Sequence, residues 1–209
     1  MRSIAAAVLF AAFFSACGTS NGSSPDIDGG SGSSDDGVDA RPEFMCWPSV
    51  DPIPRGTVEL GKGGTAFSEM PEVLNLQYGF QGGFMVKVWT RMTGIDAGEA
   101  GTTVDSRNPA TRVRGKFVDS DAALQLPGDC GDRGSYVANA TGGYDYYNEI
   151  AVVFNTCWGN DSLVGKQLKI TAELMDASGS YATDSKTITV ADILDPTFQN
   201  IPTTPGCGQ

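Results

Sequence analysis

The stretch Gln77–Gly94 reads QYGFQGGFMVKVWTRMTG and holds the longest uninterrupted β-pattern of the chain. Because side chains alternate between the two faces of a strand, residues from Phe84 onward fall into two sets. One face is expected to pack on a core and carries Phe84, Val86, Val88, Thr90 and Met92. The other carries Met85, Lys87, Trp89 and Arg91, which places a tryptophan between two cations on the solvent side. We expect the other strands to be arranged around this one.

The composition favours an all-β protein that binds neither nucleic acid nor anionic lipid. The 209 residues include 27 glycines, and long helical patterns are scarce. With 14 Lys+Arg against 25 Asp+Glu the formal net charge is −11, whereas both of those ligands require basic patches. The chain contains no histidine, so it lacks the commonest general base and the commonest transition-metal ligand. The length favours one domain with a single sizeable core.

Residues 1–16 have the pattern of a signal peptide. One positive charge at Arg2 precedes the apolar run Ile4–Phe14, which is too short to span a bilayer core of about 30 Å. The segment Phe14–Gly18 resembles the bacterial lipobox, and this resemblance implies that Cys17 is lipidated and becomes the mature N-terminus. The alternative is ordinary cleavage near Ala16, which leaves a free Cys17.

Residues 17–41 predict a flexible tether between the lipid and the folded domain at 42–209. Beyond Cys17 the segment contains little except Gly, Ser and Asp, so it lacks the apolar surface that offsets the entropy of ordering. The residue after Cys17 is Gly18. An aspartate at this position would resemble an inner-membrane retention signal. We therefore expect anchoring in the outer membrane, facing the cell surface or the periplasm.

The domain is expected to be a sandwich of about seven to nine antiparallel strands. The segment 149–155 is apolar on both faces and is therefore expected to be a central strand. A long loop is expected at 94–109, and an extended tail after Val190. The predicted strands are 57–60, 73–78, 84–92, 111–118, 122–126, 136–138, 149–155, 167–174 and 187–190.

Two resemblances agree with this fold class. The strand 167–174, the turn Asp176–Gly179 and the strand 187–190 resemble the final hairpin of immunoglobulin-like modules of the polycystic-kidney-disease or fibronectin type III kind. Separately, the segments 60–67 and 79–86, with the residues that lead to Trp89 and Arg91, resemble uncharacterised outer-membrane lipoproteins of myxobacterial type. The resemblances imply an immunoglobulin-like β-sandwich and a surface location, but no activity.

Four cysteines remain once Cys17 is assigned to lipid. An even number in an exported protein predicts two disulfides, for which three pairings exist. We favour Cys130 with Cys157, which would clamp a turn to the end of a strand, and Cys46 with Cys207, which would tie the ends of the domain together. A four-cysteine zinc site is disfavoured because no C-x₂-C pair occurs. We expect neither a metal nor a cofactor.

The candidate binding residues form two groups. The first is Trp89 with Lys87 and Arg91, where the alternative is a ring that a loop covers or that stacks on the two cations. The second is an aromatic cluster that could stack on sugars or contact a protein: Tyr144, Tyr146, Tyr147 and Trp158. A further row of cations, Arg112, Arg114 and Lys116, fits either an anionic ligand or, as we prefer, a solvent-facing strand that protects a sheet edge.

No catalytic set is visible in the sequence, so we expect a protein that is not an enzyme. There is no Ser/His/Asp set, Cys/His pair, phosphate-binding loop or metal motif. The preferred hypothesis is a lipid-anchored envelope protein that acts as a non-catalytic binding module for a protein or glycan. One alternative is a structural spacer in an envelope complex. Another is a histidine-free secreted hydrolase, because a pair of carboxylates suffices for glycoside hydrolysis.

Overall fold

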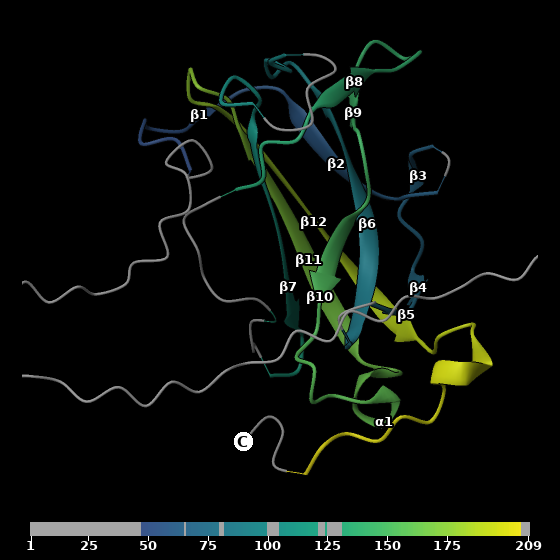
Figure 1. Ribbon diagram of the computed structural model, residues 1–209. Helices are drawn as coiled ribbons and strands as arrows, with labels where there is room; N and C mark the ends of the chain where they lie inside the picture. Colours follow the sequence, from purple (N-terminus) through teal and green to yellow (C-terminus); the bar gives the residue numbers. More distant parts are fainter. Residues whose placement is uncertain are drawn as a thin grey trace, which may run out of the picture. The chain divides into compact units, whose positions relative to one another are not determined.

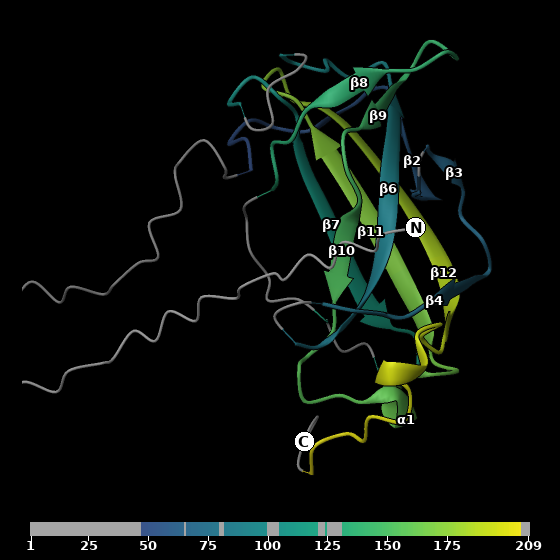
Figure 2. The ribbon, with the colours of Figure 1, turned by 45° about the vertical axis from the view of Figure 1, so that its right-hand side comes forward.

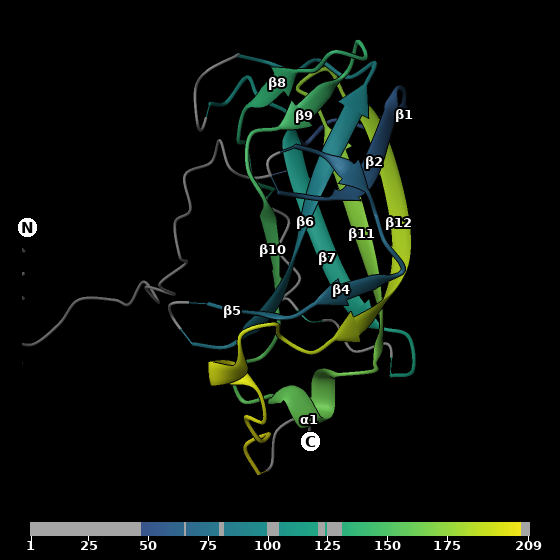
Figure 3. The ribbon, with the colours of Figure 1, turned by 90° about the vertical axis from the view of Figure 1, so that its right-hand side faces the viewer.

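A computed structural model describes residues 47–64, 66–79, 82–99, 105–120, 124 and 131–205, all within the compact unit Asp39–Gln209. The predicted signal peptide, Cys17 and the tether lie outside the described residues. Two β-sheets pack face to face (Figure 1, Figure 3). The predicted all-β sandwich is therefore confirmed.

The first sheet has five strands in the order β1, β12, β11, β7, with β4 also paired to β12. Both β1 and β4 run parallel to β12, whereas the sequence analysis predicted antiparallel strands throughout. The two other pairings, β12 with β11 and β11 with β7, are antiparallel. The strand bounds are β1 Ile53–Pro54, β4 Val73–Asn75, β7 Ala110–Phe117, β11 Gln167–Met175 and β12 Ser180–Ala191.

The second sheet has seven strands in the order β3, β2, β6, β9, β8, with β5 and β10 also paired to β6. The described residues thus form twelve strands rather than seven to nine. The strands that the sequence did not indicate are β1, β3 and β9, and the predicted strand at 73–78 divides into β4 and β5. The bounds are β2 Thr57–Lys62, β3 Ser68–Glu69, β5 Gln77–Tyr78, β6 Phe84–Thr93, β8 Tyr136–Ala138, β9 Tyr144–Tyr146 and β10 Ile150–Val153.

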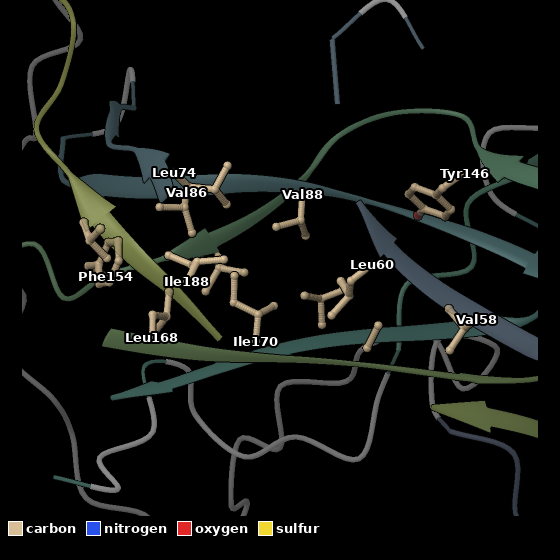
Figure 4. Packing of buried hydrophobic residues seen from close by; sticks show 14 of the residues in the cluster. Val58, Leu60, Leu74, Val86, Val88, Tyr146, Phe154, Leu168, Ile170 and Ile188 are labelled. Carbon is tan, nitrogen blue, oxygen red and sulfur yellow. The ribbon is translucent and has the colours of Figure 1, made fainter. Parts of the chain in front are cut away.

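Strand β6 is confirmed as the long strand at the centre of its sheet, and its two faces divide as predicted. The inward residues Phe84, Val86, Val88, Thr90 and Met92 are all buried, and the alternate residues from Met85 to Arg91 are partly exposed. Figure 4 shows Val86 and Val88 directed at Ile170 and Ile188 of the five-stranded sheet. Burial of this face stabilises the sandwich by about 25 cal/mol for each Å² of apolar surface.

The predicted closing hairpin is also confirmed, as β11 and β12. Its turn is held by Asp176, whose carboxylate accepts hydrogen bonds from the backbone N–H groups of Ser178 and Ser180, each 2.9 Å long. Gly179 follows with a φ of +88°, a conformation that glycine adopts without steric cost. Desolvation raises the pKa of Asp176, but hydrogen bonds from the Ser178 hydroxyl and from the N–H groups of Asp96 and Ser180 outweigh it, so the pKa lies below its ordinary value.

The predicted strand at 73–78 is wrong, because this segment contains two strands in different sheets. Strand β4 pairs with β12 in one sheet, and β5 pairs with β6 in the other. Between them Leu76 is buried, and its N–H donates to the carbonyl of Ala191. The alternating pattern signals burial of Leu74 and Leu76 correctly, but it does not show that the chain crosses between the layers (Figure 3).

The segment 149–155 is not the central strand that its apolar content predicted. In the described part of the chain, β10 pairs only with β6, and Val153 is 39% exposed. The central strand of the seven-stranded sheet is β6, because it is long enough to pair with other strands along both of its edges. The predicted strand at 122–126 lies outside the described residues except for Leu124.

The predicted extended tail is also only partly right, because it contains the 3-10 turn Pro196–Phe198 (η2). A short helix, α1 (Asn160–Leu163), precedes β11. It contacts the tail, since the N–H of Asn160 donates to the carbonyl of Ile201 at 2.9 Å. No helix in the described ranges is long and apolar enough to cross a membrane.

A buried hydroxyl network joins the two sheets near β8. The Tyr136 side chain is fully buried, and its hydroxyl lies 2.9 Å from the Thr90 hydroxyl on β6 and 3.0 Å from the Thr111 hydroxyl on β7. Burial raises the pKa of Tyr136, so it stays protonated and can donate to one threonine while it accepts from the other.

We predict that Tyr136→Phe lowers the free energy of unfolding by about 1–3 kcal/mol, because it removes a hydrogen-bond partner from two buried hydroxyls. Urea unfolding with an unchanged m-value measures the loss. Tyr147→Phe is the matched control, since the Tyr147 side chain is 40% exposed. Equal stability of the two variants would show that the hydroxyl network contributes nothing.

Candidate functional site

The two cations beside Trp89 are engaged in ion pairs. The Arg91 guanidinium donates from Nε to Asp145 Oδ1 at 2.6 Å and from Nη2 to Asp145 Oδ2 at 3.0 Å. This bidentate hydrogen bonding holds the pKa of Asp145 below its usual range and raises the pKa of Arg91. The Lys87 ammonium lies 3.2 Å from a Glu149 carboxylate oxygen. Neither cation is therefore fully available to a ligand.

Trp89 itself is half-buried and does not stack on Arg91. The cation–π contact of Arg91 is with Phe67, whose ring centroid lies 4.1 Å from the guanidinium carbon. The Phe67 ring also lies against Gly61, which pairs with Trp89 across β2 and β6. A Cβ atom added to Gly61 would lie 2.4 Å from this ring. The indole N–H of Trp89 is buried and has no hydrogen-bond partner among the described residues. Trp89 is therefore part of a covered surface rather than an open platform.

The three tyrosines serve mainly as packing. Tyr146 is buried, and its hydroxyl donates to Asp132 at 2.6 Å. Burial and this carboxylate raise its pKa. Tyr144 is half-buried against the core, so only Tyr147 presents substantial aromatic surface, at 40% exposure.

Trp158 does not join this cluster. It follows β10 and packs on Phe117, with ring centroids 5.2 Å apart. It precedes α1, and Figure 2 shows α1 at the opposite end of the sandwich from β8 and β9. The structure therefore separates Trp158 from the tyrosines with which the sequence grouped it.

Of the cysteines, only Cys157 lies among the described residues, and it is disulfide-bonded. Cys46, Cys130 and Cys207 lie outside them, so the proposed pairings remain predictions. No group of three or more His, Cys, Asp or Glu side chains that could hold a metal ion occurs in the described ranges.

A pocket lies where the pairing of β6 is interrupted on one side. On this side β5 pairs with residues 84–85 of β6, and β2 pairs with residues 89–93, so residues 86–88 have no strand neighbour there in the described structure. The end of β2, the crossing segment 74–78 and the tail 193–198 surround the opening, which has a volume of about 350 Å³. We call it the β2–β5 pocket.

One wall of the β2–β5 pocket is aromatic and apolar. The rings of Tyr78 and Phe198 stack with centroids 4.5 Å apart and an interplanar angle of 13°. Tyr78 also meets Phe84 edge to face at 5.2 Å, which fixes its ring against the core. Leu194 adjoins the pair and is 79% exposed, the largest exposure among the large apolar residues described.

The remaining wall carries ammonium, carboxylate and amide groups. Lys87 and Glu149 meet there as an ion pair, and Lys62 brings a second ammonium. Asp195 accepts a hydrogen bond from the N–H of Thr197, which holds the pKa of this carboxyl below its ordinary value. The polar lining residues are Lys62, Asn75, Gln77, Lys87, Glu149 and Asp195.

Lys87 was predicted as a candidate binding residue beside Trp89, but neither the pocket nor its aromatic pair was predicted. Tyr78 and Phe198 are 120 positions apart, and the tail had been expected only to be extended. The one signal for Tyr78 was its place before the glycine turn that precedes β6. Nothing in the sequence near Phe198 indicates that it returns to β5.

Comparison with protein-family models, curated proteins and solved structures found no match for the chain. The geometry of the β2–β5 pocket is therefore the basis for proposing a function.

We predict that the Arg91–Asp145 pair makes stability depend on acid pH. The folded-state pKa of Asp145 lies below the ordinary value of 3.8, so its stabilisation is complete above that value. It is lost as the pH falls through the folded-state pKa. Asp145→Asn should cost about 1–3 kcal/mol at pH 7 and should reduce the loss of stability below pH 3.8, as measured by urea unfolding across that range.

The matched control is Asp119→Asn. Asp119 pairs with Lys166 at 2.7 Å, but the two side chains are 55% and 45% exposed, so this pair contributes little. An Asp145→Asn variant that keeps the wild-type stability and the wild-type acid dependence would contradict the prediction.

Proposed function

We propose that this protein is a lipid-anchored protein of the bacterial cell envelope whose sandwich binds a glycan in the β2–β5 pocket without chemical change. The observation that carries the proposal is the pairing of a stacked aromatic wall with a wall of ionic and amide groups in one concave site. Sugars combine apolar C–H faces with hydroxyls that both donate and accept, so they match both walls.

The pocket favours a glycan over a protein surface. Its volume of about 350 Å³ lies in the range of about 300–1,000 Å³ that is typical of small-ligand pockets. A protein partner usually requires a broader patch with aromatic anchors at its centre. Here the aromatic rings of Tyr78 and Phe198 lie beside a recess, which suits the end of a chain or a single sugar unit.

The carboxylates of the pocket support binding rather than hydrolysis. A glycosidase needs one carboxylic acid whose pKa is raised so that it can protonate the leaving group. The pKa of Asp195 is instead lowered by its hydrogen bond from Thr197. Glu149 forms an ion pair with Lys87, at 3.2 Å from the ammonium. Both acids are therefore suited to accepting hydrogen bonds from sugar hydroxyls.

The N-terminal sequence and the disulfide at Cys157 support a location in the cell envelope. The apolar run, the lipobox-like Phe14–Gly18 and the Gly/Ser/Asp tether form the pattern of a bacterial lipoprotein. A disulfide at Cys157 fits an oxidising compartment outside the cytoplasm. A tether of about 25 residues would hold the pocket some tens of ångströms from the lipid anchor.

We predict that Tyr78→Ala weakens glycan binding by roughly tenfold or more, because it removes half of the aromatic wall. Isothermal titration of the full chain against a panel of neutral oligosaccharides measures the affinity. Chromatography of the recovered sugar should show it uncleaved.

Tyr147→Ala is the matched control, since Tyr147 and Tyr78 are 40% and 37% exposed and Tyr147 lies near β9, away from the pocket. Gln77→Ala adds a change on the polar wall that leaves the core intact. The proposal fails if no sugar binds, or if Tyr78→Ala and Tyr147→Ala bind equally well while both remain folded.

We also predict that Cys17→Ser releases the protein from the membrane fraction. The substitution removes the thiol to which the lipid is attached. Metabolic labelling with palmitate and globomycin treatment of wild-type cells provide the check. Labelling that persists in Cys17→Ser, or processing that globomycin does not block, would contradict the lipid anchor.

A further inference from the structure

The interruption beside β6 leaves the backbone groups of one residue directed into the β2–β5 pocket. The N–H of Phe154 donates to the carbonyl of Phe84 at 2.9 Å, so the backbone groups of Phe84 point toward β10. In an antiparallel pair this direction alternates from residue to residue, so Val86 and Val88 also face β10, whereas Lys87 faces the opposite side. The N–H and C=O groups of Lys87 therefore point into the interruption between β5 and β2.

Both neighbouring strands end before they can pair with Lys87. The register of β2 would place Gly63 opposite Lys87, but β2 ends one residue earlier. The register of β5 would place Asn75 there, but Asn75 belongs to β4 and pairs with β12. Gly63, Asn75 and Lys87 all line the pocket. No strand in the described part of the chain therefore pairs with Lys87 on this side, and solvent or a ligand must supply the hydrogen bonds.

A partner for Lys87 needs a donor and an acceptor that two carbon atoms separate. In an antiparallel sheet the partner residue supplies both from one N–Cα–C=O unit. A sugar with an acetamido group has the same spacing, because two ring carbons separate its amide nitrogen from the oxygen of the adjacent hydroxyl. The amide N–H can donate to the Lys87 carbonyl, while the hydroxyl oxygen accepts from the Lys87 N–H.

We propose that the β2–β5 pocket is selective for glycans built from N-acetylated amino sugars, which the backbone of Lys87 recognises through the acetamido group and its neighbouring hydroxyl. This inference rests on the glycan-binding function proposed above and names the class of glycan. The aromatic wall of Tyr78 and Phe198 provides a surface for the C–H face of the same sugar.

Other residues of the pocket suit the acetyl group. Ile193 and Leu194 line the pocket and offer apolar surface to the methyl group. The Lys62 ammonium, on the polar wall, can donate to the acetyl carbonyl. A pair of adjacent hydroxyls could also meet the Lys87 backbone, but it has no methyl or carbonyl for these neighbours. An unacetylated amine would bring a further cation beside Lys62 and Lys87.

A sugar fits the interruption better than an extended peptide. Peptides that bind to a strand edge add several successive backbone hydrogen bonds. Here the unpaired side of β6 covers only residues 86–88, and β5 and β2 close its two ends. Of these three residues only Lys87 faces the pocket, so a peptide strand would gain a single residue pair.

The test joins a comparison of ligands to a direct measurement on the Lys87 amide. The full chain is titrated with β-1,4-linked trisaccharides of N-acetylglucosamine, of glucose and of glucosamine, and with acetyl-trialanine amide. We expect the N-acetylated trisaccharide to bind roughly tenfold more tightly than any of the others. In NMR hydrogen exchange of the free protein, the Lys87 N–H should exchange faster than those of Val86 and Val88, which face β10. The N-acetylated trisaccharide should slow the exchange of Lys87.

The variant Lys87→Ala distinguishes the backbone from the side chain. It removes the ammonium but keeps the N–H and C=O groups, so affinity should fall by a similar factor for every trisaccharide and the preference for the N-acetylated one should persist. Lys166→Ala is the matched control, because this lysine is also paired with a carboxylate, Asp119 at 2.7 Å, but does not line the pocket. It should bind all three trisaccharides as the wild type does.

Four results would overturn the inference: equal affinity for the N-acetylated and the glucose trisaccharides, tighter binding of the glucosamine trisaccharide or the peptide, unchanged exchange of the Lys87 N–H on binding, or loss of the preference in Lys87→Ala. If the glucose trisaccharide binds equally well and Tyr78→Ala weakens that binding, the glycan-binding function stands and only the selectivity is refuted. If no sugar binds at all, the proposed function itself fails.

Discussion

The hydrogen-bonding requirement of β6 is the constraint on which the rest of the structure depends. The strand is ten residues long, and its backbone N–H and C=O groups must be paired wherever they are buried. No single neighbour is long enough to do this. In the described structure β2 and β5 divide one side of β6, while β9 and β10 divide the other. The short strands β5, β9 and β10 follow from this division.

The same division produces the pocket beside β6. On one side of β6, residues 86–88 fall between β5 and β2, and the β2–β5 pocket lies at this interruption. The chain that forms β5 has just left the five-stranded sheet at β4, so the crossing segment itself becomes a wall of the pocket. Tyr78 is held there by Phe84 on one side and by Phe198 on the other. The pocket is therefore a consequence of the topology as much as of the side chains.

Local patterns in the sequence predicted the parts of the fold that are local. The face division of β6 and the β11–β12 hairpin depend on alternation and on one turn, and both were predicted. The crossing at Leu76 and the edge position of β10 depend on which distant strand supplies the hydrogen bonds, and alternation does not encode that choice. For the same reason Lys87 could be named as a candidate, whereas its ion-pair partner Glu149 and the pocket residue Phe198 come from segments that only the fold brings together.

The ion pairs on the outward face of β6 explain why Trp89 is not the binding platform that its sequence context indicated. Lys87 and Arg91 each have a carboxylate partner there, so the surface around Trp89 is internally neutralised. An acidic group would have to displace Glu149 or Asp145 before it could pair with either cation. Alternation along the strand identifies the cations of this face, but their carboxylate partners come from β9 and from the residue before β10, which only the fold brings beside β6.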